Sequence, residues 1–553
     1  MVPFVDLDLP SGRVIEWVLR PSSKADSATV AIEATKRPSF SQELYYHFIE
    51  WHSRRHEGRQ AIWLATTVEI AGNINLDALR TTFRHLVIRH ETLRSEFRMN
   101  PDPDGTQGLF GLLQCDVLHP DAVVFEETEL GVFDRVEPLR EALLDRIDKT
   151  IDTNKGPVML MGVVIGEEKS VAYIICDHLV TDGFSCAIKA NELGTIYDAT
   201  VADEPVELPE VGSYLDYTTQ EYVDEEKVEP EDPRIELWRG FVRRNGHVFT
   251  EFPVELNTKK GEWHPALLDV IQVLDSYEAD AFERMCRARS ASVVSGLLAV
   301  DGIALHEIGG ADVLRVVMPI AQRRSSEWQN AVGWFVNIVP LEVPLAGVDK
   351  FTEVLAGAHK AFRTALTAAD LPVASLFMHL GTQYLPLNSF FNLKPQTHFS
   401  YIDYRKLPGA AHVERWNQTM VMGVANTSDA RTWYFRTHEG IFMFNDFIDT
   451  PRAREVLAAY EAGVRRVLTE VIDLTPVAYS KPEAELAQVP RAAHAESPRK
   501  QPAATTAPAG ATAARRHIAG RSRVMTTRPG VFTPIFMIKD LGGVGRVKDT
   551  PEL

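Results

Sequence analysis

Apolar and polar positions recur along this chain with periods that predict both strands and helices. Residues 61–70 are mostly apolar and end at an Ala-Gly-Asn turn, which predicts a strand. Asn75 is a suitable N-cap for a helix that starts directly after it. An apolar stripe with alternating steps of four and three runs through this helix and past its end, over Leu79, Phe83, Leu86, His90, Leu93 and Phe97.

The clearest pattern is a β-hairpin in the first half of the chain. Residues 158–165 and 171–176 are apolar and rich in β-branched side chains, with a polar turn at 166–169 between them. The second run has no polar interruption, which predicts a strand buried on both faces. Its end is therefore the first point where water or a substrate can enter. A helix is predicted over 187–197, just beyond it.

The nine residues at this strand end, 177–185, read Asp-His-Leu-Val-Thr-Asp-Gly-Phe-Ser. His178 is the first imidazole there, and an imidazole with a near-neutral pKa held at a strand end suits general-base catalysis. Gly183 permits a sharp turn or the close approach of another backbone. Asp182 is short enough to fix the loop by a hydrogen bond or by pairing with a cation. We expect Ser185 to cap the following helix rather than to act as a nucleophile.

The chain is too long for a single core, and its composition changes along its length. We predict a first lobe over 1–200 and an acidic, Pro-rich linker over 201–236. A second lobe follows over 237–475, with a strand at 313–320 and a closing amphipathic helix at 452–472. The Ala- and Pro-rich tail, 476–553, is too poor in apolar residues to form a core and is expected to be disordered.

Charge and cysteine content narrow the function. The formal net charge of the chain is −18. A protein this acidic is not expected to bind nucleic acid, because that binding depends on neutralising phosphate charges. The chain has 4 cysteines, at scattered positions, which predict neither a metal site nor a disulfide framework. No leader pattern and no run of about 18 apolar residues is present. We therefore expect a cytoplasmic protein without a transmembrane segment.

Five segments, in order, carry a resemblance to a known superfamily. They are 38–43, 86–97, 177–183, 214–217, and Arg323 followed by 332–341. The chain resembles the condensation-domain and CoA-dependent acyltransferase superfamily, whose central motif is HHxxxDG and which includes chloramphenicol acetyltransferase. It looks most like the free-standing, polyketide-associated acyltransferases. The motifs are separate and correctly spaced, so the likeness is specific.

This resemblance implies an α/β fold of two similar lobes, a pseudo-dimer with a tunnel between them that passes His178. It implies that a hydroxyl, or less often an amine, of a secondary metabolite or glycolipid attacks an acyl thioester, with His178 as the base. Asp182 would have a structural role, paired with Arg323, and Gly183 would permit the loop. The resemblance implies no metal and no resident cofactor, because acyl-CoA or the phosphopantetheinyl thioester of an acyl carrier protein is a co-substrate. A monomer is expected.

One departure from the motif leaves alternatives open. Asp177 replaces the first His, and with Asp182 and Ser185 it also fits the DxxxxDxxS pattern of heterocyclization domains. We favour the acyltransferase because the retained His carries the base role. The alternatives are a condensation or cyclization enzyme acting on carrier-bound chains, and a non-catalytic docking protein. Asp177 would either orient the loop or raise the pKa of His178 through its charge.

Other residues are weaker candidates. Asn337 and a backbone N–H near Gly183 are candidates for stabilising an oxyanion. His398 and Ser400 belong to an aromatic-rich stretch that would line an acyl or acceptor pocket or pack in the core. His90 is expected to be structural, because the corresponding segment of the superfamily closes a helix against the core.

Overall fold

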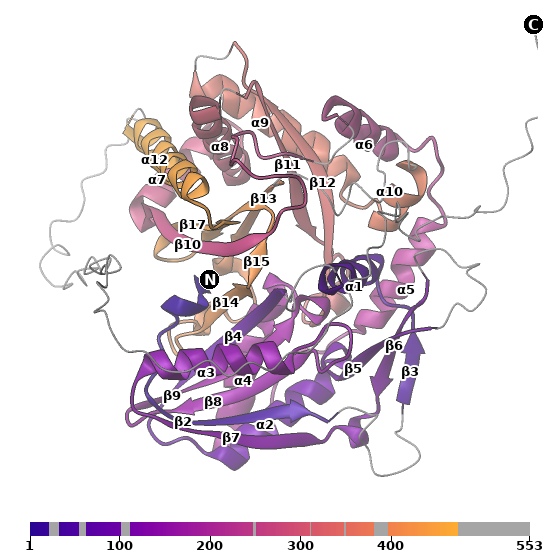
Figure 1. Cartoon of the computed structure of the whole chain (residues 1–553), viewed down its shortest axis with the longest axis vertical. Helices are drawn as coiled ribbons and strands as arrows, with labels where there is room; N and C mark the ends of the chain where they lie inside the picture. The colour runs from indigo at the N-terminus through magenta and orange to yellow at the C-terminus, as the bar shows by residue number, and fades with distance from the viewer. Residues whose placement is uncertain are drawn as a thin grey trace, which may run out of the picture. The chain divides into compact units, whose positions relative to one another are not determined.

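The computed structural model describes residues 1–20, 32–54, 62–100, 111–246, 250–309, 311–347, 350–380 and 396–473. These residues form two seven-stranded sheets, a smaller three-stranded sheet and the helices that cover them (Figure 1). The predicted α/β fold is confirmed.

The first sheet contains the predicted hairpin. Its strands, in spatial order, are β1 (Val2–Pro3), β14 (Thr419–Val424), β4 (Ile62–Ala71), β9 (Lys169–Asp177), β8 (Met159–Ile165), β2 (Gly12–Leu19) and β7 (Phe125–Phe133). The hairpin is the antiparallel pair β8 and β9, and β4 pairs with β9 on its other side. β14 comes from the second half of the chain and pairs antiparallel with β4. This strand therefore lies outside the lobe to which its sequence position assigns it.

Strand β9 is buried on both faces, as its unbroken apolar run predicts. Ala172, Ile174 and Cys176 point into a core that they share with α2 (Leu76–Arg89) and α4 (Gly183–Ala202). The alternate residues, Val171, Tyr173 and Ile175, point into a second core beneath α3 (Val136–Thr150). Because successive side chains of a strand point to opposite faces, both faces need apolar residues.

The predicted helix after β4 is α2, and the Asn75 side chain accepts a hydrogen bond from the Ala78 N–H as its N-cap. The apolar stripe continues past the helix as predicted, because Leu93 is buried in the short 3-10 helix η3 (Glu91–Arg94). The small third sheet follows, made of β3 (Ile32–Lys36), β6 (Leu113–Leu118) and β5 (Ser95–Met99).

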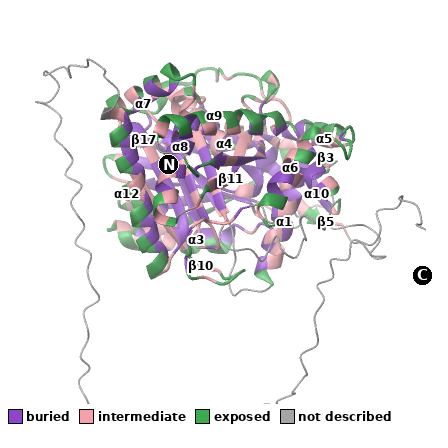
Figure 2. Ribbon diagram, turned by 90° about the horizontal axis from the view of Figure 1, so that it is seen from above, coloured by how far each residue is buried: buried purple, intermediate pink, exposed green. Residues whose placement is uncertain are grey.

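The second sheet has a covered face and a face turned to the first lobe. Its strands, in order, are β12 (Val336–Pro344), β11 (Val313–Ala321), β13 (Thr397–Asp403), β16 (Ala430–Arg436), β17 (Gly440–Ile448), β10 (His264–Asp275) and β15 (Asn426–Thr427). The largest core packs its covered face under α7 (Ser276–Ala288), α8 (Val293–Gly309), α9 (Phe351–Ala365) and α12 (Pro451–Asp473). Figure 2 shows buried strands beneath helices whose outer faces are exposed.

The opposite face of the second sheet packs against the first lobe. Met420 and Met422 of β14 share a core there with Phe435 of β16 and Phe444 of β17. Leu64 of β4 and Cys186 of α4 belong to the same core. Apolar contacts thus join the two lobes next to the start of α4.

The predicted linker contains helices rather than an extended chain. α5 (Tyr214–Glu225) and the start of α6 (Pro233–Arg244) fall inside it. Tyr214 and Tyr217 of α5 are buried against Phe335, so apolar side chains spaced three apart anchor this helix. α10 (Val373–Leu380) packs against α6. The lobe division itself stays a prediction, and the tail lies outside the described residues.

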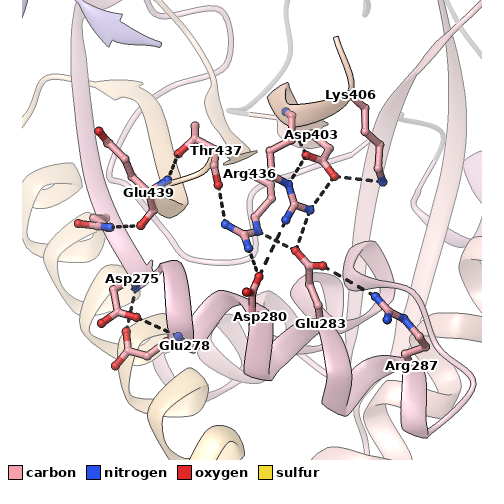
Figure 3. Close-up of polar contacts among 12 residues, drawn as sticks. Asp275, Glu278, Asp280, Glu283, Arg287, Asp403, Lys406, Arg436, Thr437 and Glu439 are labelled. Carbon is pink, nitrogen blue, oxygen red and sulfur yellow. Dashed lines mark hydrogen bonds and ion pairs between the residues drawn. The ribbon is translucent and has the colours of Figure 1, made fainter. Parts of the chain in front are cut away.

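An ion-pair network ties α7 to the ends of β13 and β16 (Figure 3). Arg436, which is 2% exposed, donates to Glu283 at 2.6 Å and also to Asp280. Arg405 donates to Glu283 at 2.9 Å and to Asp403 at 2.9 Å. These ion pairs hold α7 against the C-terminal ends of β13 and β16.

Within the described ranges, no single helix has the length and apolar character needed to cross a membrane. α7 and α8 pass that test only as a pair, and they are bent by 100° at the break between them.

Candidate active site

His178 begins a short 3-10 helix, η5 (His178–Val180), directly after β9. Asp177 caps this helix, because its carboxylate accepts a hydrogen bond from the Leu179 N–H at 2.8 Å. The Thr153 hydroxyl donates to the same carboxylate at 2.5 Å. Asp177 is fully buried. The residue that replaces the first His of the motif therefore anchors the loop from the protein interior.

These contacts agree with an orienting role for Asp177, and an effect of its charge on the pKa of His178 stays a prediction. Burial raises the pKa of the Asp177 carboxyl from 3.8 to about 7, against the lowering effect of its hydrogen bonds from Thr153 and the Leu179 N–H. The pKa of His178 is lowered rather than raised, first by burial and further by the positive charges of Arg431 and Lys189. The imidazole is therefore held in its neutral form, which is the form that can accept a proton.

Asp182 and Arg323 form the pair that the resemblance implies. Arg323 donates to both carboxylate oxygens, at 2.9 and 3.0 Å, and both side chains are 3% exposed. Asp182 also accepts from the backbone N–H groups of Ser185, at 2.7 Å, and Phe335, at 3.0 Å. Burial alone would raise the pKa of Asp182, but the Arg323 charge and these hydrogen bonds hold it below its ordinary value. Four hydrogen bonds thus occupy the Asp182 carboxylate.

Two expectations about the loop need correction. Gly183 is not among the residues with positive φ, and the atom nearest to a side chain added there would be Cδ1 of Ile402, at 3.1 Å. The glycine therefore makes room for a side chain from β13 rather than for a sharp turn or another backbone. Asp182, not Ser185, is the N-cap of α4. The Ser185 hydroxyl donates to the Gly333 carbonyl at 2.9 Å and links the loop to the 332–341 segment.

Two residues that support the loop were missed from the sequence. Gln42 of α1 (Phe40–Ser53) donates to the Leu179 carbonyl at 2.7 Å, which explains why the 38–43 motif belongs to this site. Lys189 of α4 is fully buried, and its ammonium lies 3.0 Å from the Thr181 hydroxyl and 3.2 Å from the Cys176 sulfur. A lysine inside the apolar pattern of a helix was the available signal, because such a residue is rarely buried without a reason.

Aromatic rings surround the His178 imidazole. Its centroid lies 4.5 Å from that of Trp334 and 6.4 Å from that of Tyr45. Nδ1 is buried and makes no hydrogen bond to another described residue. No hydrogen bond to Nε2 occurs in the described part of the chain either, yet this nitrogen is not among the buried unpaired atoms. Nε2 is therefore the nitrogen that a substrate hydroxyl can reach.

A cavity of about 290 Å³ adjoins this imidazole, and residues of both lobes line it. Tyr45 and Trp334, which contact His178, belong to its wall, although His178 itself does not. The rest of the wall is mainly apolar, with Phe48, Val317 and Phe377 among its residues. Cavities that bind small molecules have this character, largely apolar with few polar groups.

The weaker candidates fall in three different places. His398 lines the cavity, and burial lowers the pKa of its imidazole to about 4. Ser400 is buried two residues further along β13, on the same face of the strand. Asn337 does not line the cavity: its amide nitrogen donates to the carbonyls of Ala369, at 3.1 Å, and Leu371, at 2.5 Å. Both of its N–H groups are used, so neither is left for an oxyanion.

The structural expectation for His90 agrees with its contacts. Its Nε2 lies 2.7 Å from a carboxylate oxygen of Glu192, and the side chain is buried. Arg89 donates to the same carboxylate at 3.1 Å. This cluster lies between α2 and α4, where it fixes the packing of the two helices.

Comparison with known proteins agrees with this geometry. PapA1 of Mycobacterium bovis, a 2'-acyl-2-O-sulfo-trehalose (hydroxy)phthioceranyltransferase, is 26% identical over 472 residues, which cover 84% of this chain and 87% of the relative. The acyltransferase PapA3 of Mycobacterium tuberculosis is 25% identical, covering 70% of this chain and 78% of its own. The prediction that this chain is an acyltransferase is confirmed.

Solved structures share the fold. The PapA2 acyl transferase superposes with a TM-score of 0.74 at 20% identity, covering 85% of this chain and 99% of that one. The first condensation domain of the calcium-dependent antibiotic synthetase gives a TM-score of 0.60 at 16% identity, covering 80% and 97%. The family model for the condensation domain matches residues 39–401, well over half of the sequence. The chain therefore belongs to the condensation-domain family.

Proposed function

We propose that this enzyme moves an acyl group from a thioester to a hydroxyl of a glycolipid or secondary metabolite, with His178 as the general base. The observation that carries the proposal is a neutral imidazole, fixed at a strand end beside an apolar cavity, with Nε2 left open. The similarity to acyltransferases named for trehalose-based acceptors supports a sugar hydroxyl as the nucleophile.

In the proposed reaction, Nε2 takes the proton of the acceptor hydroxyl as its oxygen attacks the thioester carbonyl. The carbon–sulfur bond then breaks, the ester forms, and the imidazolium returns its proton to the leaving thiolate. A thioester is already activated, so alignment of the two substrates and removal of one proton are the main requirements. The anchored loop supplies that alignment, because Asp177 and Asp182 fix its two ends.

The donor in this proposal is acyl-CoA or an acyl carrier protein, and no resident cofactor or metal takes part. The apolar part of the cavity suits the acyl chain. We propose the cytoplasm as the location, since the four cysteines are free and buried and a reducing compartment preserves free thiols.

The test is release of free thiol from a panel of acyl-CoAs in the presence of a sugar acceptor. We expect thiol release that depends on the acceptor and falls by a factor of about 10² to 10⁴ in His178→Ala. His438→Ala is the matched control, because His438 is exposed in the turn between β16 and β17. Equal turnover by the wild type and His178→Ala would remove His178 as the base.

Cyclization is the less favoured function. It requires Asp177 to act on the substrate, whereas the contacts of Asp177 with Thr153 and Leu179 occupy its carboxylate inside the protein. A cyclization enzyme predicts that Asp177→Ala is inactive while His178→Ala keeps most of its activity.

A further inference from the structure

Four polar residues gather at one end of the cavity, on the side of the second sheet. We name this group the polar corner; it consists of Gln396, His398, Ser428 and Asp429. His398 stands beside Val317 of β11 and Arg431 of β16 in the sheet register. Tyr45 and Trp334, whose rings lie beside His178, line the same cavity as the polar corner. The polar corner therefore lies near the proposed base.

The polar corner has hydrogen-bonding capacity that the described part of the protein does not use. His398 makes no hydrogen bond to any described residue and is neutral, so one ring nitrogen donates and the other accepts. Asp429 accepts only a long bond, 3.5 Å, from the Gln396 N–H and lies 4.0 Å from Arg431. Hydroxyl groups can use both kinds of site, because each hydroxyl donates once and accepts as well.

The cavity carries little positive charge. Among its described lining residues, Asp429 is the one charged side chain, and no lysine or arginine is present. Arg431, the cation beside His398 in the sheet register, is already paired. It donates through Nε to Asp446 at 2.9 Å and through a second nitrogen to the same oxygen. A sulfate or phosphate placed here would face a carboxylate without a cation to compensate it, which is costly in a partly desolvated site.

Aromatic faces complete the cavity. Trp263 and Trp334 both line it, together with the polar corner. Flat apolar rings beside planar hydrogen-bonding groups match a molecule with apolar C–H faces and many hydroxyls.

We propose that the polar corner binds the hydroxyl groups of an uncharged, polyhydroxylated acceptor such as a sugar headgroup, and that it discriminates against sulfated or phosphorylated acceptors. The inference rests on the proposed function, because the acceptor must place one hydroxyl at Nε2 of His178. It assigns this enzyme an acceptor that differs in charge from the sulfated sugar in the name of PapA1.

The test is calorimetric titration of the full-length protein with trehalose and with trehalose 2-sulfate, in the absence of a donor. We expect the wild type to bind trehalose about tenfold or more tightly than its sulfate, and Asp429→Asn to bind trehalose about tenfold more weakly. The same variant should narrow the preference for the uncharged sugar to about threefold or less, because the repulsive carboxylate is gone. Asp121→Asn, with the same charge change at a residue whose side chain is 90% exposed, should match the wild type.

Binding of the sulfate as tight as that of trehalose, no binding of trehalose, or an unchanged trehalose affinity in Asp429→Asn would each overturn the inference. The proposed function fails in a different way. If trehalose binds with the expected pattern but no acyl-CoA yields free thiol, the acceptor site is supported and the proposed acyl transfer is wrong. If thiol is released but the binding pattern is absent, the polar corner is not the acceptor site.

Discussion

The two histidines beside the cavity, His178 and His398, differ in how the protein holds them. His178 belongs to a loop whose polar neighbours are all engaged: Asp177 with Thr153 and Leu179, and Asp182 with Arg323. His398 is the second residue of the regular strand β13, and the polar groups next to it have few partners. Both imidazoles are neutral, because burial lowers the pKa of each.

This difference separates positioning from recognition. Side chains that are held by several hydrogen bonds fix geometry and offer a ligand little, since the carboxylates of Asp177 and Asp182 are already occupied. Open hydrogen-bonding groups at a cavity wall cost stability when they are desolvated without a ligand, and they regain it when a ligand pairs with them. In the proposed reaction, the first lobe would therefore supply a rigid base, and the second lobe would supply the groups that bind the acceptor.

The largest expected effect follows from breaking the Asp182–Arg323 pair. Arg323→Met leaves a buried carboxylate without its cation, and we expect unfolding free energy to fall by about 3 to 5 kcal/mol. Urea unfolding measures this, and activity should be lost with the loop geometry. Asp182→Asn combined with Arg323→Met should recover part of the stability, because no unpaired charge remains.

Arg54→Met is the control for this experiment. Arg54 is also paired, with Glu50, but its side chain is 72% exposed, and we expect no measurable shift of the urea midpoint. A small effect of Arg323→Met, comparable with that of Arg54→Met, would mean that the pair does not hold the loop.

The anchor at the other end of the loop gives the next largest effect. Asp177→Ala leaves the Thr153 hydroxyl and the Leu179 N–H without a partner, and we expect a loss of about 1 to 3 kcal/mol. A displaced imidazole should also lower kcat by about tenfold or more. Asp177→Asn keeps an acceptor oxygen, so it should retain more of the stability and more of kcat than Asp177→Ala. Equal losses in the two variants would contradict an orienting role.

The same residue predicts a pH dependence of stability. Because burial raises the pKa of Asp177 from 3.8 to about 7, the folded protein binds this proton more tightly than the unfolded chain does. Its contribution to stability is therefore present at low pH and is lost as pH rises from about 4 through about 7. In urea unfolding at several pH values, the unfolding free energy of Asp177→Asn should increase relative to that of the wild type as pH rises. A constant difference would contradict the raised pKa.

Much of this loop could be predicted from the sequence because its elements are local. The apolar run of β9 dictates a doubly buried strand, and the residue that follows such a strand must lie at the edge of the sheet. Asn75 caps its helix as predicted, through a side chain that reaches only three residues along the chain. The resemblance to the superfamily then implied Arg323 as the partner of Asp182, and the two side chains are paired.

The parts that could not be predicted depend on contacts far apart in the sequence. β14 joins the first sheet from more than 300 residues away, and its apolar pattern fits either sheet equally well. Asn337 lies in a motif, but the carbonyls of Ala369 and Leu371 determine where its amide points. Ser185 looked like a helix cap because the sequence does not reveal that Gly333 lies against it.

A substitution of Lys189 tests whether its buried charge lowers the pKa of the His178 imidazole. Lys189→Met keeps the length of the side chain but removes a buried positive charge near His178, so the pKa of the imidazole should rise. The acid limb of the kcat/KM profile should then move to higher pH, by about one pH unit or less. Lys149→Met, at a side chain that is 69% exposed, should leave the profile unchanged. An unmoved acid limb in Lys189→Met would show that this charge does not reach His178.

The smallest effect is expected on the open side of the cavity. His398→Phe removes one donor and one acceptor from the polar corner, so KM for a sugar acceptor should rise by about three- to tenfold while kcat stays within about twofold. The acid limb of the kcat/KM profile should not move, since the pKa of His398 is about 4 and the ring stays neutral above that pH. A fall in kcat with KM unchanged would instead give His398 a part in the chemical step. The separation of the two histidines into a positioned base and a recognition group would then be wrong.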